Sequence, residues 1–334
     1  MSKRSMSLID RARAVGLQGA AREHASLRTN LRHRIDIFGI MAQRGIQVMF
    51  QPLNPLYGAY LDEEVPGVLI NVKHPPNLQR FTAAHEYGHF VMQHGTSADS
   101  EEQIFSSHSL NNVQEVEAQN FAAHFLMPAQ LVNVLLQHMG LFSDPSRMTP
   151  REAYQLSLEL GVSYEALVNH LVATKKVSQN IAAMLRRQTP KTIKASIGQG
   201  VRPQDIRADV WTFSEHDNER QVFTYLNDEL HVYLAESPND DNVWNIVDSS
   251  LARSITLLKS DLEISSLLEF SQSERSEFVR HFAFRVEAPG SFILRLSKQD
   301  NRSSHAPLSQ QFELQLEVPL RPSQGLLEQQ KELL

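Results

Sequence analysis

Cysteine is absent from this chain of 334 residues. Its absence excludes a disulfide framework and any zinc site built from thiolates. Long apolar runs are also lacking, because no stretch of 18 apolar residues occurs and the N-terminus has no extended apolar segment. Neither a membrane-spanning helix nor a secretory leader is expected. We therefore expect a cytoplasmic protein with no membrane partner.

A strong excess of positive charge is missing too. The formal net charge of −6 gives no general case for nucleic-acid binding. The charge is unevenly divided: residues 208–320 carry 9 Lys and Arg against 19 Asp and Glu, whereas residues 1–34 are basic. The basic segment is interpreted as a solvated amphipathic helix; a docking surface for an acidic partner is the alternative. The chain length allows two domains.

The pattern His85-Glu86-Tyr87-Gly88-His89 carries the clearest chemistry. On a helix, residues four apart lie one above the other, so both imidazoles can share one metal ion. Glu86 is rotated by about 100° around the axis and can reach a metal-bound water as general base. The competing interpretation is a chance pair of surface histidines.

The sequence around this motif favours a helix. Pro75-Pro76 cannot lie in a helix interior, Asn77 is a favourable N-cap, and a helix is predicted from there to about His94. Gly88 falls on the predicted buried face of this helix. Because a glycine there costs about 1 kcal/mol of helix propensity, we expect another backbone to pass close to it.

A catalytic zinc site needs a third protein ligand. The segment from Glu117 to Pro128 predicts a second helix, on which Glu117, Phe121 and His124 share one stripe. Glu117 is therefore the candidate ligand, and Glu115 is the alternative if the helix register differs.

These segments resemble the ImmA/IrrE family of bacterial and phage zinc metallo-endopeptidases. The resemblance rests on the motif with its flank from Arg80, on Glu117-Ala118, on Phe121-Ala122-Ala123 and on Leu126-Met127-Pro128, and it covers roughly residues 30 to 175. It implies Zn²⁺ held by His85, His89 and Glu117, with Glu86 as general base. One departure is Gln119, which stands where the family usually has asparagine. The resemblance also implies a protein substrate, typically a transcriptional repressor cleaved in a stress response.

Residues 149–187 predict a helix-turn-helix unit. Thr149-Pro150 is a helix start signal, and Gly161-Val162-Ser163 forms the turn. The second helix offers few cations before Lys175, so direct nucleic-acid binding is not expected.

Beyond residue 187 the spacing of apolar residues changes from helical to alternating. Residues 188–207 are predicted to be a linker, because they contain two prolines and two glycines, and residues 321–334 a C-terminal tail. Between them the apolar residues alternate, as at Phe282, Phe284 and Val286, which predicts about eight strands in an antiparallel sandwich. Leu230-His231-Val232-Tyr233-Leu234 and Val243-Trp244-Asn245 resemble chagasin-like cysteine-peptidase inhibitors, whose fold is immunoglobulin-like.

The predicted fold class is α+β. A zincin-like metallopeptidase domain, residues 1–187 with its zinc core at about 30–140 and its helix-turn-helix unit at 149–187, precedes an all-β immunoglobulin-like sandwich at 208–320. The expected function is zinc-dependent endopeptidase activity on a regulatory protein such as a repressor. The alternative is a non-catalytic regulatory protein acting through its sandwich or its helix-turn-helix unit. The sequence leaves the oligomeric state open.

Overall fold

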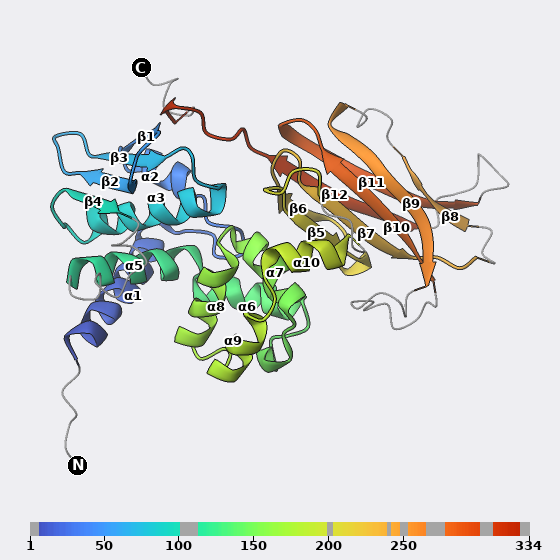
Figure 1. The fold of residues 1–334 in the computed structure, drawn as a ribbon, viewed down its shortest axis with the longest axis horizontal. Helices are drawn as coiled ribbons and strands as arrows, with labels where there is room; N and C mark the ends of the chain where they lie inside the picture. Colours follow the sequence, from blue (N-terminus) through green and yellow to red (C-terminus); the bar gives the residue numbers. More distant parts are fainter. Residues whose placement is uncertain are drawn as a thin grey trace, which may run out of the picture. The chain divides into compact units, whose positions relative to one another are not determined.

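The computed structural model describes residues 7–100, 113–198, 203–238, 242–247, 253–264, 278–300 and 310–327. The chain divides into two compact units. The first unit is Met1–Arg187 together with Pro322–Leu334, and the second unit is Gln188–Arg321 (Figure 1). The fold is α+β, as predicted. In this division the C-terminal segment from Pro322 belongs to the first unit.

The first unit contains a five-stranded sheet and most of the helices. Its strands are β1 (Gln47–Gln51), β2 (Leu56–Leu61), β3 (Gly67–Asn71), β4 (Ser97–Ser100) and β13 (Gly325–Leu326). Their order is β13-β1-β3-β2-β4. β1 pairs with β3 in parallel, whereas β2 is antiparallel to both β3 and β4. The two-residue strand β13 covers the β1 edge, where Leu326 pairs with Met49.

Helices pack on this sheet and on one another. They are α1 (Leu8–Leu27), α2 (Ile37–Gln43), α3 (Pro76–Val91), α5 (Val113–Leu126), α6 (Ala129–His138), α7 (Pro150–Leu160), α8 (Tyr164–Ala173) and α9 (Gln179–Leu185). Helix α3 carries the motif and packs against β2, β3 and α5. Its N-cap is Pro75 and Pro76 is its first residue, so the predicted cap at Asn77 is corrected by two positions. Proline suits this first position because a backbone N–H there would have no partner within the helix.

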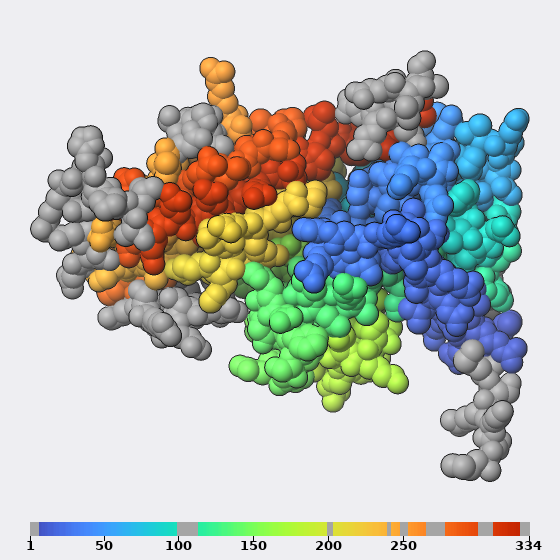
Figure 2. Space-filling view, turned by 180° about the vertical axis from the view of Figure 1, so that it is seen from behind, coloured from blue at the N-terminus to red at the C-terminus, as the bar shows by residue number. Residues whose placement is uncertain are grey.

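Helix α1 is the amphipathic helix expected from the basic N-terminal segment. Ala12, Gly16 and Ala20 are buried along one side, which packs on α5. Its other side lies on the molecular surface, as the blue segment of Figure 2 shows. Residues 1–6 of the basic segment lie outside the described residues.

Helices α7 and α8 occupy the segment predicted as a helix-turn-helix unit. A capping box at Thr149 and Glu152 begins α7, and Gly161 ends it with φ 66°, a backbone conformation that suits glycine. Ser163 caps α8. No helix in the described part of the chain is both long and apolar enough to span a membrane.

The second unit contains two four-stranded sheets. The first has the order β5-β7-β10-β9 and the second β6-β12-β11-β8. The strands are β5 (Val210–Phe213), β6 (Arg220–Phe223), β7 (Glu229–Ala235), β8 (Asn242–Ile246), β9 (Ile255–Ile264), β10 (Phe278–Val286), β11 (Gly290–Asp300) and β12 (Gln310–Val318). On β12, Phe312, Leu314, Leu316 and Val318 are buried at alternate positions, as the sequence pattern predicts.

The predicted linker is not wholly irregular. It contains helix α10 (Pro190–Ile197), which a capping box at Thr189 and Thr192 begins and which contacts β5. Most pairings of the two sheets are antiparallel, but β5 pairs with β7 and β6 with β12 in parallel. The immunoglobulin-like description of this unit stays a prediction.

Candidate metal centre

Three donor side chains meet between α3 and α5. They are His85 and His89 from α3 and Glu115 from α5, and their ligand atoms all lie within 4.8 Å of one another. His85 Nε2 lies 3.2 Å from His89 Nε2 and 3.2 Å from Glu115 Oε2. His89 Nε2 lies 3.6 Å from Glu115 Oε1. In the described part of the chain this is the single such group of three or more donors.

The third donor differs from the predicted one. Glu117 lies outside the cluster, and its Oε2 is 3.0 Å from His94 Nε2. The reason is the register of α5 against α3. A Cβ added to Gly88 would lie 3.3 Å from Ala118 Cα, so the backbone of α5 passes Gly88 at Ala118. Glu115, three residues earlier, shares that face, whereas Glu117 is rotated away from it.

The approach at Gly88 confirms that another backbone passes this glycine. A Cβ there would also lie 3.1 Å from the ring of Phe121. Helix α5 therefore reaches α3 closely enough for a short glutamate side chain to contact both imidazoles.

The cluster is buried and electrostatically matched. His85 and His89 are each 1% exposed and Glu115 is 8% exposed. Burial alone would raise the pKa of Glu115, but the hydrogen bonds from His85 and His89 outweigh it and hold that pKa well below its usual range. Two imidazole nitrogens and one ionised carboxylate together form a donor set that catalytic zinc sites use. These three residues therefore fit a divalent metal ion.

Glu86 follows His85 on α3 and lies next to the sheet. Its side chain is fully buried, and its Oε2 accepts a hydrogen bond from Ser97 Oγ of β4 at 3.0 Å. A Cβ added to Gly58 of β2 would lie 2.9 Å from Glu86 Oε1. Ser97 was not predicted as a site residue. The sequence holds no signal for it, because the contact depends on β4 pairing with β2.

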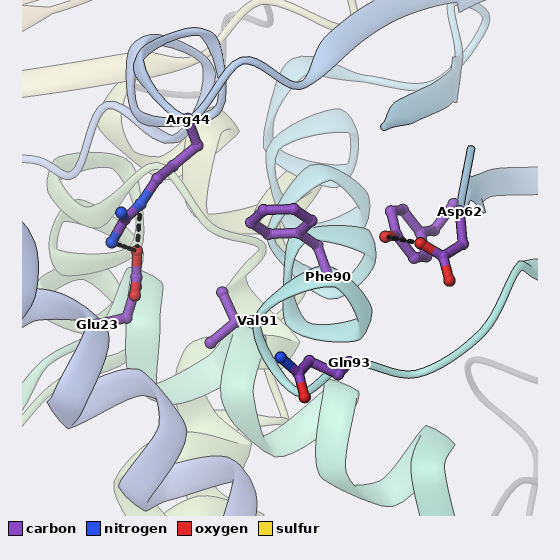
Figure 3. Close-up of a pocket in the computed structure, with 7 residues that line it drawn as sticks. Glu23, Arg44, Asp62, Phe90, Val91 and Gln93 are labelled. Atoms are coloured by element: carbon purple, nitrogen blue, oxygen red, sulfur yellow. Dashed lines mark hydrogen bonds and ion pairs between the residues drawn. The ribbon is translucent and has the colours of Figure 1, made fainter. Parts of the chain in front are cut away.

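A cavity of about 490 Å³ opens near the C-terminal end of α3 (Figure 3). It is lined by the bonded pairs Glu23–Arg44 and Tyr60–Asp62 and by Phe90, Val91 and Gln93. The three cluster residues are not part of this lining.

Comparisons with known proteins agree with this geometry. Residues 41–172 match the Peptidase_M78 family, described as the IrrE N-terminal-like domain. Residues 41–172 are therefore similar to the IrrE N-terminal-like domain. A similar protein is the radiation response metalloprotease IrrE of Deinococcus deserti, 36% identical over 97 residues. That match covers 29% of this chain and 34% of the relative, so it spans about a third of the relative's length.

Two solved structures are distantly similar to this chain. The cysteine protease inhibitor EhICP2 from Entamoeba histolytica is 11% identical with a TM-score of 0.28, over 33% of this chain and 95% of its own. The solution structure of Amebosin is 14% identical with a TM-score of 0.24, over 33% of this chain and 98% of its own.

One position departs from the ImmA/IrrE pattern, and the structure places it. Gln119 follows Glu115 by one turn on α5. Its Oε1 is buried and accepts no hydrogen bond within the described residues. The neighbouring Asn120 donates from Nδ2 to the Val116 carbonyl at 2.8 Å, a contact within its own helix. Asn120 therefore does not take the place of the usual asparagine in the cluster.

Proposed function

We propose that this protein is a zinc-dependent endopeptidase in which His85, His89 and Glu115 hold the metal and Glu86 is the general base. The observation that carries the proposal is the convergence of the three donors beside a buried carboxylate of the same helix. The similarity to the IrrE N-terminal-like domain supports it. Glu115 replaces Glu117 as the proposed ligand because of its position in the cluster.

Each side chain has a distinct part in the proposed mechanism. Zinc, when bound, supplies a Lewis acid and lowers the pKa of a coordinated water to about 7. His85 and His89 present Nε2 without a proton, and Glu115 supplies negative charge. Glu86 takes the proton of the attacking water and passes it to the leaving amine. Ser97 donates to Glu86 Oε2 and so orients the carboxylate.

For the substrate we propose a regulatory protein, such as a helix-turn-helix transcriptional repressor. The support is the likeness to ImmA/IrrE proteins and the name of the matched relative, a radiation response metalloprotease. The test incubates the zinc-loaded protein with candidate helix-turn-helix repressors and follows cleavage by mass spectrometry. Glu86→Gln is expected to retain zinc and to lose about 10²- to 10⁴-fold in cleavage rate. Glu63→Gln, an exposed acidic residue of the same unit, is the matched control.

The burial of the cluster favours a second candidate, a regulatory binding protein whose zinc site is idle. A peptide must reach the metal, yet His85 and His89 are each 1% exposed. In that case Glu86→Gln has no effect on the cellular response, while deletion of residues 208–320 abolishes it. Equal cleavage by the parent and Glu86→Gln would contradict the proposed role of Glu86, whereas no cleavage by the zinc-loaded parent would favour this second candidate.

A further inference from the structure

His94 returns to the metal centre after α3 has ended. Helix α3 is capped by Met92, and Gln93 adopts a positive φ of 57°. The His94 amide then donates to the His89 carbonyl at 2.9 Å, which closes the turn. The left-handed residue reverses the chain, so the His94 side chain lies beside His89 and is only 6% exposed.

Two hydrogen bonds connect His89 to a carboxylate through His94. His94 Nδ1 lies 3.0 Å from His89 Nδ1, and His94 Nε2 lies 3.0 Å from Glu117 Oε2. The other ring nitrogen of His89, Nε2, faces His85 and Glu115. The three side chains therefore form a line, Glu117–His94–His89, that leads away from the cluster.

The chemistry of this line permits one arrangement of protons. A ring nitrogen that binds a metal must carry no proton, so His89 bears its proton on Nδ1. That N–H donates to His94 Nδ1, which must then be an acceptor. His94 consequently carries its own proton on Nε2 and donates it to the Glu117 carboxylate, which only accepts. Every donor in the line meets an acceptor.

We propose that His94 and Glu117 are positioning residues that fix the ring orientation and tautomer of His89 for metal binding. This inference rests on the proposed function, because it presumes that His89 binds the metal. Neither residue belongs to the three-donor cluster, so neither is a ligand or a catalytic residue. A hydrogen bond that ends on a carboxylate makes a ligating imidazole a better donor, and losing such a partner typically costs 10- to 100-fold in metal affinity.

This role gives each of the two acidic residues of α5 a separate part in metal binding. Glu115 would contribute its negative charge directly to the metal ion, whereas Glu117 acts on His89 through the two hydrogen bonds of His94. The close approach of α5 at Gly88 places both in one helix–helix contact.

The test measures zinc binding by the metal-free full chain in competition with a chromophoric chelator. His94→Phe, which keeps a ring but removes both hydrogen bonds, and Glu117→Gln, which removes only the charge, are compared with the parent. We expect one zinc per chain in both, with affinity lowered 10- to 100-fold in His94→Phe and less in Glu117→Gln. Exposed His33→Asn serves as the control and should bind like the parent. Glu115→Gln should lose stoichiometric binding.

A second measurement begins with the parent protein and so does not depend on how well a variant folds. Long-range ¹H–¹⁵N correlation of the zinc-loaded parent reports histidine tautomers. We expect the proton on Nδ1 of His89 and on Nε2 of His94, and in His94→Phe we expect the His89 N–H signal to exchange faster with solvent.

The outcomes separate the two proposals. If the parent binds no zinc, the proposed function fails. If the parent binds zinc and His94→Phe and Glu117→Gln bind it equally tightly, the positioning role alone fails. If Glu117→Gln loses stoichiometric zinc while Glu115→Gln keeps it, Glu117 is the ligand and the positioning role is overturned. The opposite tautomer on His94 also overturns it.

Discussion

At the scale of single residues, Gly58 sets the space available to the proposed general base. A Cβ at this position would lie 2.4 Å from Thr82 Cγ2, 2.9 Å from Glu86 Oε1 and 2.9 Å from the Leu69 carbonyl. Two of these neighbours belong to the helix and one to the backbone of β3, so the added methyl must displace the sheet or the carboxylate. Glycine is required here by its proximity to Thr82, Glu86 and the backbone of β3.

Gly58→Ala is therefore expected to damage catalysis more than metal binding. Overpacking of this kind costs about 1–3 kcal/mol in stability. Because the clash involves Thr82 and Glu86 and none of the three donors, the variant should still bind one zinc while cleaving its substrate at least about tenfold more slowly. The matched control is Gly67→Ala in β3, where a Cβ would meet nothing nearer than 3.7 Å. Parent-like cleavage by Gly58→Ala would contradict this reading of the site.

The site residues could be predicted from the sequence where spacing alone decides their geometry. His85 and His89 lie together because they are four apart on one helix. The choice between Glu115 and Glu117 depends on how α5 docks, and that register is set by Gly88 meeting Ala118 and Phe121. Ser97 and the turn that returns His94 depend on long-range pairing and on one left-handed residue, for which the sequence carries no periodic signal.

At the scale of elements, the contact between α1 and α5 depends on a second glycine. A Cβ at Gly16 would lie 2.3 Å from the Glu117 carbonyl oxygen and 2.8 Å from the Phe121 amide nitrogen. These are backbone atoms of the helix that carries Glu115, so they cannot move without moving the metal centre. The backbones of α1 and α5 are therefore in contact at Gly16, as those of α3 and α5 are at Gly88.

Gly16→Ala should lower the stability of the first unit although it adds a good helix former. The gain in helix propensity is about 1 kcal/mol, whereas the clash separates two helices and costs about 1–3 kcal/mol or more. Gly19→Ala is the matched control, because a Cβ there would meet only side chains, none nearer than 3.3 Å. This variant keeps the gain in helix propensity, so its free energy of unfolding should be unchanged or higher. Urea unfolding followed by circular dichroism at 222 nm distinguishes them. A higher midpoint for Gly16→Ala would show that α1 is not held this closely.

Two elements differ from the prediction for identifiable reasons. Helix α10 lies in the predicted linker, yet Thr189-Pro190 is the same start signal as Thr149-Pro150. Gly198 and Gly200, which follow it in the sequence, instead favoured the prediction of a linker. Strand β9 was not predicted because its apolar residues do not alternate: Leu257 and Leu258 are adjacent and both exposed, on an edge strand with an irregular register.

At the scale of the whole molecule, the two units can be observed separately. Both tryptophans, Trp211 and Trp244, lie in the second unit. All the α-helices described except α10 lie in the first. Tryptophan fluorescence therefore reports the second unit, and circular dichroism at 222 nm reports mainly the first.

The second unit is expected to lose stability in mild acid. His281 of β10 is 1% exposed and contacts His231 and Tyr233 from β7 and Glu263 from β9, with Lys259 and Asp261 of β9 nearby. Burial, with a smaller contribution from His231, lowers the pKa of His281 to about 4 against the opposing hydrogen bond to Glu263. The unfolded chain takes up this proton below about pH 6.5, so stability is full above that pH and falls as the pH drops towards 4.

His281→Phe tests this contribution. Between pH 7.5 and 5.0 the parent should lose about 2 kcal/mol that the variant does not lose, as measured by urea unfolding with tryptophan fluorescence. His216→Asn removes an exposed histidine of the same unit and should follow the parent. An equal loss in His281→Phe and the parent would show that other groups carry the acid sensitivity.

The chain crosses between the units twice, and the second crossing could not be predicted from the sequence. The predicted tail contains β13, whose partner β1 lies some 270 residues earlier and whose two residues are too few for a pattern. The Leu327 amide donates to the Val48 carbonyl at 2.9 Å, and Gln324 Nε2 donates to Gln51 Oε1 at 3.1 Å. Gly325 has a φ of 126°, which favours glycine.

The C-terminal segment should therefore stabilise the first unit although the second unit precedes it in the chain. A chain ending at Arg321 loses β13 and leaves β1 as an open edge, where its unpaired backbone groups invite pairing with another chain. We expect a lower urea midpoint at 222 nm, an unchanged midpoint by tryptophan fluorescence, and faster amide exchange in β1. Gly325→Ala should reproduce a part of this loss, about 1–3 kcal/mol, because only the strained residue changes. Gly95→Ala, at an open position, is the control. A truncated chain with the parent midpoint at 222 nm would show that β13 contributes nothing to the sheet that supports the metal centre.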